Sequence, residues 1–450
     1  MTTPAHAERM LSVDVYRGLV MLLLLPDLTG GFSLHRVAEN YPDSGWLQTL
    51  ATQFQHVQWS GMALWDFIEP SFVFLVGVAL SLSYARRSRE HQTRQDFLAH
   101  GYIRCVALFL LALLLKMPLE SHLDELWPLA LLTIGFALPE RVAQFVGVTS
   151  VTLRHQMENI YKLLLLGLAA WWLSTNISRL GAYDFAHVFS SIALASIFVL
   201  PLIGKSQRVQ MSAVALVLVG SWALFAAYPT ANAHSDLVRV GVQPTDQFFD
   251  GFFAHWNKNT NIGWAFDVWL MNALPRAVPF EFHGMGLTTL GFVPLIATIL
   301  FGVMAGEFLQ RNEDRARVRN RLLTAGAAVL AAGLLAGEFL CPIVKMIWTP
   351  SWALVSGGLA LLTLGTLHHV CEVKRIRSWA LPLSILGTNS ILLYVLASTF
   401  RWRVLEVPRA IFGADALDAG FGPLLQAFFF LAFVWIVAAL LYRQRWLIRL

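Results

Sequence analysis

Long apolar runs, separated by short polar segments, recur along the whole sequence. A helix that crosses the hydrocarbon core of a bilayer needs about 20 mostly apolar residues. The pattern therefore predicts an all-α protein, a polytopic membrane helix bundle of about twelve (ten to twelve) transmembrane helices. The predicted spans are 16–34, 65–84, 102–117, 125–146, 159–176, 187–203, 211–228, 286–308, 322–343, 351–369, 380–399 and 424–441.

The weakest of these spans is 125–146, because Pro139, Glu140 and Arg141 interrupt it. It is a full span, a broken or re-entrant one, or no span at all. No repeat of fixed period is visible, and no inverted repeat of the kind found in secondary transporters. We therefore expect one transmembrane domain over 1–450.

Two predicted loops, 35–64 and 229–285, are long, and loops of such length tend to be functional. The second contains the segment HWNKNTN at 255–261, followed by a stretch rich in Trp and Phe. These aromatic residues suit a short amphipathic helix at the lipid interface. Within this segment His255, Asn257, Lys258 and Asn261 are candidate substrate-binding residues.

The composition agrees with a membrane protein, since 56% of the residues are hydrophobic and only 14% are charged. Soluble domains carry about 25% charged residues. The net charge of +5 is small, and the basic residues lie in short loops between apolar runs, so nucleic-acid binding is not expected. Three widely spaced cysteines (Cys105, Cys341 and Cys371) show no metal-binding pattern, and no metal is expected.

The positions of the basic residues predict the orientation, because short cytoplasmic loops hold the Lys and Arg excess. An even number of spans with both termini cytoplasmic puts every strong basic cluster inside. It also puts the two long loops outside, and with them His56, which lies at the entrance to the second span. The first ten residues are polar and the first apolar run is long enough for a full span, so no cleavable signal peptide is expected. The clusters are Arg86, Arg87, Arg89 and Arg94; Lys205 and Arg208; Arg311, Arg315, Arg317, Arg319 and Arg321; Lys374, Arg375 and Arg377; and Arg443, Arg445 and Arg449.

The strongest chemical signal lies in 55–83, where His56 precedes a span whose start carries Asp66, Glu69 and Pro70. Imidazole titrates near neutral pH and suits general acid–base work. Ionisable groups within a span are costly and usually mark a site. Trp59 and Trp65 would shield such a site from water. His56 is therefore a candidate catalytic residue, and the alternative is a structural histidine at the membrane interface.

Asp27, in LLLLPDLTGG, is a second candidate catalytic residue. A carboxylate inside a span must be paired, protonated or facing a wet cavity. Pro26 and the Gly30–Gly31 pair would loosen the helix there and free backbone groups to line a cavity. The alternative is an aspartate that only hydrogen-bonds within the structure.

Polar residues at the inner ends of the first two spans suit an anionic ligand. Asp14 and Arg17 share one helix face, so they form an ion pair or Arg17 faces a ligand. The arginines of 86–94 either enforce the orientation or bind phosphate, whose geometry Arg matches well.

Two later positions are also candidates. Lys345, in CPIVKMIWTPSW at 341–352, either snorkels to the interface or lines an acceptor pocket with Trp348 and Thr349. Asn389, in GTNSILLYV at 387–395, suits a hydrogen bond to a neighbouring helix.

An ordered set of motifs resembles the bacterial relatives of heparan-α-glucosaminide N-acetyltransferase, a family of transmembrane acyltransferases. The resemblance covers nearly the whole chain and is weakest from about 120 to 230. The motifs are RxxSxDxxRG at 9–18, HxxWxG at 56–61, DxxxPxFxFxxG at 66–77, a serine at Ser83, GLTTLGFVPLIATILFGVMAGE at 286–307, CPIVKMIWTPSWAL at 341–354 and GTNSILLYV at 387–395.

The resemblance implies that the histidine of HxxWxG, here His56, is the active-site residue. It implies a second polar group near the outer end of the first span; the family has asparagine there and this sequence has Asp27. The implied donor is acetyl-CoA on the cytoplasmic side, near Arg17, Ser83, Arg86 and Arg87. The implied acceptor is an amino sugar or glycan on the opposite side, and a homodimer is plausible by the same resemblance.

The sequence thus predicts an acetyl-CoA-dependent N- or O-acyltransferase in a bacterial inner membrane, surrounded by lipid. His56 would act as general base or transient acyl carrier, and Asp27 would orient His56 or the acceptor. The alternative is a proton-coupled transporter or exporter of a sugar or glycan precursor, with the intramembrane carboxylates as proton sites. The candidate substrate-binding residues are Trp59, Asp66, Glu69, His255, Asn257, Lys258, Asn261, Lys345, Trp348, Thr349 and Asn389.

Overall fold

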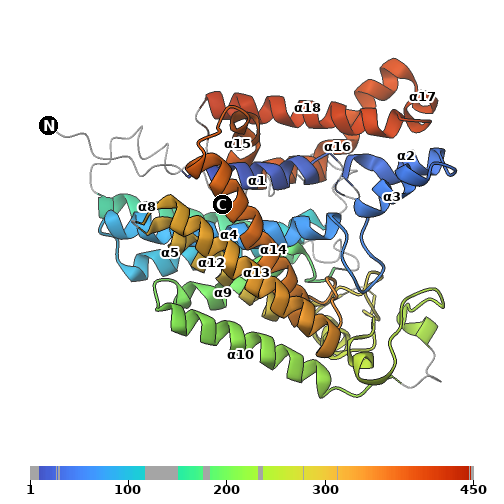
Figure 1. Ribbon diagram of the computed structural model, residues 1–450, viewed down its shortest axis with the longest axis horizontal. Coiled ribbons are helices and arrows are strands. Elements are labelled where there is room, and N and C mark those ends of the chain that lie inside the picture. The colour runs from blue at the N-terminus through green and yellow to red at the C-terminus, as the bar shows by residue number, and fades with distance from the viewer. Residues whose placement is uncertain are drawn as a thin grey trace. The chain divides into compact units, whose positions relative to one another are not determined.

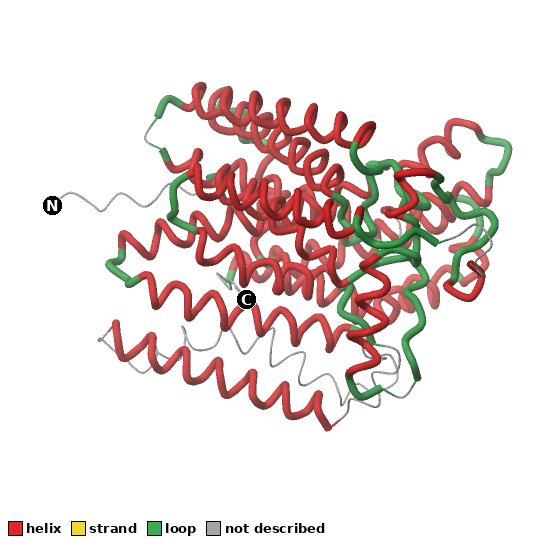
Figure 2. Tube along the Cα trace, turned by 90° about the horizontal axis from the view of Figure 1, so that it is seen from below, coloured by secondary structure: helices red, strands yellow, loops and turns green. Residues whose placement is uncertain are grey.

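A computed structural model of the protein describes residues 10–26, 28, 31–116, 151–175, 183–231, 237–276, 278–311, 313–444 and 446, without the side chains of 151–156. Asp27 and the predicted span 125–146 lie outside these residues. The described elements are helices joined by loops, with no strand among them (Figure 2). One isolated β-bridge joins Ser60 and Val344.

The α-helices carry the labels of Figure 1. They are α1 (Leu11–Leu24), α2 (Leu34–Asn40), α3 (Gly45–Gln53), α4 (Ile68–Arg89), α5 (Arg94–Leu115), α8 (Val151–Thr175), α9 (Val188–Val199), α10 (Gln207–Ala226), α11 (Ile262–Ala273), α12 (Phe292–Gln310), α13 (Arg315–Phe339), α14 (Pro350–His368), α15 (Ala380–Thr388), α16 (Ser390–Phe412), α17 (Ala414–Asp418) and α18 (Gly422–Arg443).

Within the described ranges, 7 helices are long and apolar enough to cross a membrane, as expected of a multi-pass membrane protein. Helices α15 and α16 form a pair that is bent by 75° at Asn389. If this pair counts as one span, the number of candidate spans rises to 8. The apolar helix Val188–Leu202 is shorter than these, and the predicted number of twelve spans stays a prediction. The seven are Trp65–Arg89, Arg94–Leu115, Gln207–Ala226, Thr289–Gln310, Arg315–Phe339, Pro350–Val373 and Gly422–Arg443.

Both long predicted loops contain helices. The loop 35–64 holds most of α2 and all of α3, and the loop 229–285 holds α11 and two 3-10 turns, Leu237–Val240 and Gly251–Trp256. The aromatic stretch after HWNKNTN is therefore a short helix, as predicted. Its position at a lipid interface stays a prediction, although Trp269 on α11 is 65% exposed.

The chain packs as two compact units. Unit 1 comprises Met1–Gln55, Phe308–Ala328 and Gly358–Leu447; unit 2 comprises His56–Glu307, Val329–Gly357 and Ile448–Leu450. Helices α12, α13 and α14 each contribute residues to both units. The prediction of one domain over 1–450 therefore stays open.

In unit 1, α1 lies against α15 (Figure 1) at a distance that only glycine permits. A Cβ atom on Gly18 would lie 1.9 Å from the backbone oxygen of Leu383, and one on Gly387 would lie 2.5 Å from that of Asp14. Apolar side chains of α1, α15, α16 and α18 then close a common core. Its fully buried members include Met21, Leu25, Leu393, Phe430 and Val434.

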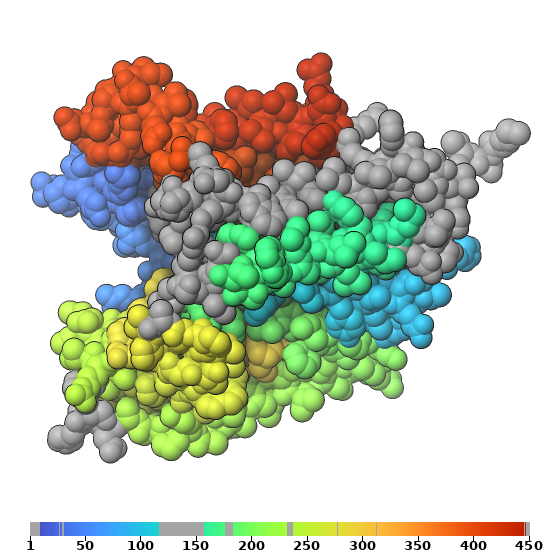
Figure 3. Space-filling model, turned by 180° about the vertical axis from the view of Figure 1, so that it is seen from behind, coloured from blue at the N-terminus to red at the C-terminus, as the bar shows by residue number. Residues whose placement is uncertain are grey.

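In unit 2, α4 and α12 approach each other just as closely. A Cβ atom on Gly77 would lie 2.0 Å from the backbone oxygen of Ile299, and one on Gly302 would lie 2.0 Å from that of Phe74. The same unit holds residues 237–276 and 278–285 (the 237–285 segment), whose 3-10 turn Gly251–Trp256 and helix α11 pack beside α10 (Figure 3). The site described next lies at the start of α4.

Candidate active site

Helix α4 begins where the sequence shows its unusual run of polar residues. A 3-10 turn, Trp65–Phe67, leads into Ile68, so Pro70 lies in the first turn of the α-helix. A proline is tolerated there because the first backbone N–H groups of a helix have no intrahelical partner. Pro70 thus lies at the beginning of the span and does not interrupt it, and Asp66 and Glu69 lie at the same end.

His56 and Asp66 form a short hydrogen-bonded pair. His56 Nδ1 lies 2.6 Å from Asp66 Oδ1, and Asp66 has no exposed surface. The other carboxylate oxygen, Oδ2, accepts the backbone N–H groups of Val57 at 3.3 Å and Ala63 at 3.1 Å. Asp66 therefore folds the ten-residue loop back on itself and fixes the imidazole ring at the same time.

Lys345 brings a positive charge to this pair from a distant part of the chain. Its Nζ lies 3.6 Å from Asp66 Oδ1, 3.3 Å from Glu69 Oε2 and 3.3 Å from His56 Nδ1. The lysine is buried, with 6% of its side chain exposed. Because buried charges are tolerated when they are paired, Lys345 and the two carboxylates stabilise one another.

These contacts decide which ring nitrogen carries the proton. An ammonium group only donates hydrogen bonds and an ionised carboxylate only accepts them. With Lys345 and two backbone N–H groups around it, Asp66 is held ionised, so His56 Nδ1–H donates to Asp66 Oδ1. Lys345 then donates to the carboxylates of Asp66 and Glu69, and its contact with His56 Nδ1 is not a hydrogen bond. This assignment leaves the lone pair on His56 Nε2.

The site opens to solvent on the side of His56 and Glu69. The His56 side chain is 30% exposed and that of Glu69 is 33% exposed, whereas Asp66 and Lys345 are buried. A base with an accessible lone pair beside a buried carboxylate suits proton abstraction from an incoming hydroxyl or amine.

The loop that carries Lys345 is held against the loop that carries His56. Gly61 N donates to Ile343 O at 2.9 Å, next to the β-bridge of Ser60 and Val344. Thr349 Oγ1 accepts the N–H of Val344 at 3.0 Å. Trp348 lies one residue earlier, in the left-handed region at φ 51°, and its Nε1 donates to Thr298 Oγ1 at 3.2 Å. Trp348 and Thr349 are buried, and they hold the loop that carries Lys345 in place.

Trp59 anchors the His56 loop to the 237–285 segment. Its indole is buried and donates from Nε1 to the backbone oxygen of Trp256 at 3.0 Å. A Cβ atom on Gly286 would lie 2.5 Å from the Trp59 ring and 2.9 Å from Lys258 Cγ. The glycine is therefore required where the indole and Lys258 approach the backbone. Trp65, the other predicted shield, has its ring centroid 6.5 Å from that of His56.

The four candidates in the HWNKNTN segment make contacts that hold this segment together. His255 Nδ1 bonds to Tyr228 O at 2.7 Å, and Asn257 pairs with both backbone groups of Phe249. Asn261 caps α11 by accepting from Trp264 N at 3.1 Å. Lys258 Nζ donates to Asp246 Oδ2 at 3.0 Å. In the part of the chain that the structure covers, none of them hydrogen-bonds to His56.

The remaining candidates lie elsewhere. On α4, Ser83, Arg86 and Arg87 follow the site toward the far end of the helix, where Arg86 approaches Glu90 at 3.9 Å and Arg87 bonds to Gln92 at 3.0 Å. Two other candidates belong to unit 1. Arg17 lies 3.9 Å from Asp14, and Asn389 Nδ2 donates to Trp446 O at 2.9 Å.

A second polar cluster of unit 2 was not anticipated from the sequence. Lys116, which follows α5, pairs with Asp184, and Asp184 Oδ2 lies 3.9 Å from His283 Nε2. Burial lowers the pKa of His283 and raises that of Asp267 to about 6. No local pattern marks this cluster, because its members come from segments far apart in the chain.

Among the residues described here, no group of three or more His, Cys, Asp or Glu side chains could hold a metal ion. A comparison with known proteins found no family model and no curated protein that matches the chain. The site must therefore be interpreted from its own geometry.

Proposed function

We propose that this protein is a membrane acyltransferase that moves an acetyl group from cytoplasmic acetyl-CoA to an amino sugar or glycan on the other side of the membrane. The observation that supports this best is the His56–Asp66 pair, which leaves Nε2 of the imidazole accessible and basic. The resemblance of the ordered motifs to the heparan-α-glucosaminide N-acetyltransferase family points to the same reaction.

In the direct route, His56 Nε2 accepts the proton of the acceptor N–H or O–H as that atom attacks the thioester carbonyl carbon. The C–S bond then breaks, and the imidazolium returns the proton to the leaving thiolate. In the two-step route, Nε2 attacks the thioester carbonyl carbon first, the C–S bond breaks and the CoA thiolate leaves. The acceptor then attacks the acetyl carbon, the bond from that carbon to the ring breaks, and the freed Nε2 takes up the proton that the acceptor loses. In both routes Asp66 keeps Nδ1 protonated and stabilises the positive charge that develops on the ring.

The surroundings of the pair suggest roles for its neighbours. Glu69, half-exposed beside His56, is placed to accept hydrogen bonds from an amine or hydroxyl of the acceptor. Lys345 keeps Asp66 ionised. The CoA phosphates would meet Ser83, Arg86 and Arg87 on α4, and Arg17 of unit 1 is a separate candidate for the same role. Twelve spans, cytoplasmic termini, a bacterial inner membrane and a homodimer are parts of the same proposal.

The test is to incubate purified protein in detergent or nanodiscs with acetyl-CoA labelled in the acetyl group and a panel of amino sugars and glycans. We expect labelled product and free CoA in equal amounts, and less than a hundredth of that rate with His56→Ala, since general acid–base catalysis contributes about 10²–10⁴-fold. Full transfer by His56→Ala would contradict both routes. An acetylated His56 peptide after acid quench would select the two-step route.

One observation favours a transporter as the second candidate. The 75° bend between α15 and α16 at Asn389 resembles the discontinuous helices that line transporter sites. Proton-driven uptake of a sugar into proteoliposomes, with no binding of acetyl-CoA, would support that candidate and overturn the acyltransferase.

A further inference from the structure

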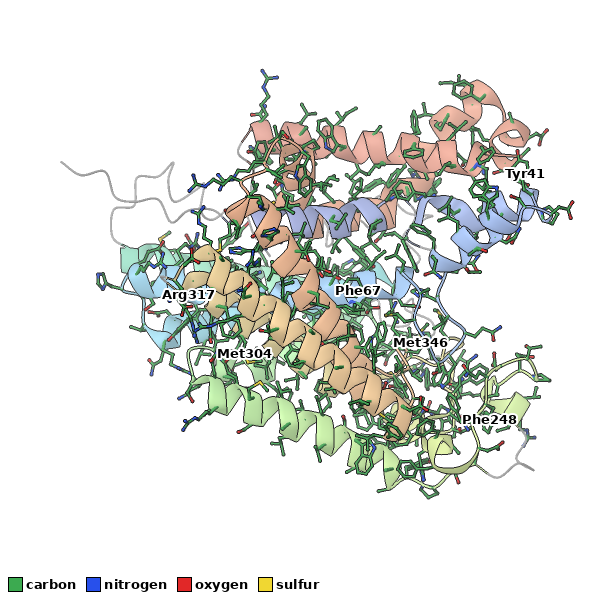
Figure 4. All side chains as sticks on the ribbon, in the orientation of Figure 1. Tyr41, Phe67, Phe248, Met304, Arg317 and Met346 are labelled. Carbon is green, nitrogen blue, oxygen red and sulfur yellow. The ribbon has the colours of Figure 1, made fainter. Side chains whose placement is uncertain are left out.

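The beginning of α13 places arginines where a lipid headgroup would lie. Only 22% of the most apolar part of this helix is buried, so most of its surface is available to lipid. Arg315 is its first residue, and Arg317 is labelled near this end of the helix in Figure 4. Because the apolar run of a lipid-facing helix ends at headgroup depth, the first turns of α13 lie at that depth. Exposed apolar residues continue along the helix, at Ala327, Ala328, Ala331, Leu334 and Leu335.

Arg319 differs from two nearby arginines in its partners. Arg321 pairs with Glu313 at 2.7 Å and Arg377 with Glu372 at 3.0 Å. Arg319 instead donates to Asn320 Oδ1 from Nε and Nη2, and its Nη1 lies 3.2 Å from His369 Nδ1. Among the described residues no carboxylate lies within ion-pair distance of it. Its guanidinium is thus half-buried, held in place by neutral groups, and left with an uncompensated charge.

His368 supplies an independent observation. Its side chain is buried, with 4% exposed, and both ring nitrogens lack a hydrogen-bond partner in the described part of the chain. The ring interacts electrostatically with the carboxylate of Glu372, which pairs with Arg377, and with Arg315 and Arg319. The Arg315 carbonyl faces the ring without reaching normal hydrogen-bond geometry. A buried polar group without a partner is costly and requires an explanation, such as an absent ligand.

The backbone around these residues is irregular. A π-helical turn, His369–Val373, follows α14, and Arg375 just beyond it lies in the left-handed region at φ 56°. Such π-turns and strained residues occur frequently at functional sites. The turn brings His368 and His369 against the first turns of α13, so that the imidazoles and guanidinium groups meet at one corner of unit 1.

We propose that this corner, formed by Arg315, Arg319, His368 and His369, binds the headgroup of an anionic phospholipid. The phosphate oxygens can accept the one N–H on Nη1 and the one on Nη2 of Arg319 that Asn320 and His369 do not use, and they supply the negative charge that Arg319 lacks. They also provide acceptors beside His368. A phospholipid is the occupant that the location favours, because its acyl chains can lie along the exposed apolar surface of α13, which a soluble phosphate would leave bare.

The proposal is tested on the full-length protein in nanodiscs of phosphatidylcholine, with or without phosphatidylglycerol. Native mass spectrometry measures retained phosphatidylglycerol, and a thermal melt measures stabilisation. The variant is Arg319→Gln, and the control is Arg317→Gln, which removes the same charge from an exposed position on the same helix. Inorganic phosphate is also added to lipid-depleted protein in detergent, to test whether the corner binds a free phosphate ion instead of a lipid headgroup.

We expect wild type and Arg317→Gln to retain phosphatidylglycerol and to melt higher with it. We expect Arg319→Gln to bind it about fivefold more weakly, as one basic residue at an anionic surface contributes about 1 kcal/mol. Equal retention by Arg319→Gln, or equal loss in both variants, overturns the proposal, and so does stabilisation by phosphate alone. If Arg319→Gln does not fold, wild-type protein that shows no preference for phosphatidylglycerol over phosphatidylcholine overturns it as well.

Discussion

The carboxylate of Asp66 lies 2.6 Å from Nδ1 of His56, and this one contact determines which nitrogen of the ring is available for chemistry. Because Nδ1–H donates to the carboxylate, the lone pair lies on Nε2, in a side chain that is 30% exposed. The sequence had assigned the orienting role to Asp27, which lies outside the described residues. The geometry gives Asp66 that role, whatever Asp27 contributes in addition.

Replacing Asp66 by asparagine tests the pair directly. The amide keeps the size of the side chain but loses the charge that stabilises the imidazolium, and it can hold the wrong tautomer. We expect the kcat of acetyl transfer to fall about 10²–10⁴-fold. The control is Asp250→Asn, which changes an exposed aspartate of the 237–285 segment and which we expect to retain activity. A folded Asp66→Asn protein with wild-type kcat would contradict the role given to Asp66.

Lys345→Met tests the buried charge network. Removing the ammonium leaves the buried Asp66 without its lysine partner and Glu69 as a second negative charge nearby. Breaking a buried ion pair costs about 3–5 kcal/mol, so we expect a clear fall in Tm. Adding Glu69→Gln should recover part of the loss, because it removes the second carboxylate. A double variant no more stable than Lys345→Met would show that Glu69 is not coupled to Lys345.

Asp267 predicts a pH-dependent difference in stability. Burial raises its pKa from 3.8 to about 6, so the folded state holds this proton more tightly than the unfolded state does. The stability contributed by the protonated form is present below about pH 4 and is lost as the pH rises to about 6. We expect Asp267→Asn to gain stability relative to wild type over that interval, by about 3 kcal/mol in all, and to keep the gain at higher pH. A difference that does not change with pH in thermal melts would contradict the raised pKa.

The contact between α4 and α12 predicts which glycines can be replaced. A Cβ atom on Gly77 would lie 2.0 Å from the Ile299 backbone oxygen, and backbone cannot move aside as a flexible side chain can. We expect Gly77→Ala to lower the Tm sharply or to abolish folding. Gly220→Ala on α10 is the matched control, because nothing lies within 4 Å of its added methyl group. It should be neutral or stabilising by up to about 1 kcal/mol. Similar Tm values for the two variants would contradict the close approach.

The helical class, most of the long apolar helices and the region of the candidate site could be predicted from the sequence. These features depend on local composition: a run such as 424–441 is apolar enough to form a membrane helix wherever it lies, and α18 covers it. His56, Asp66 and Glu69 could be identified in the same way, because they interrupt the pattern within a few residues of one another.

Which of these groups lie together could be learned only from the folded structure. Lys345 reaches His56 across 289 residues, and Asp66, rather than a residue of the first span, holds the imidazole. Lys116 and Asp184 likewise pair across 68 residues. Hydropathy records how much a segment prefers an apolar environment, but it carries no information on which segments become neighbours. Such pairings depend on how helices approach, and here contacts such as that of Gly77 with Ile299 set the approach of α4 and α12.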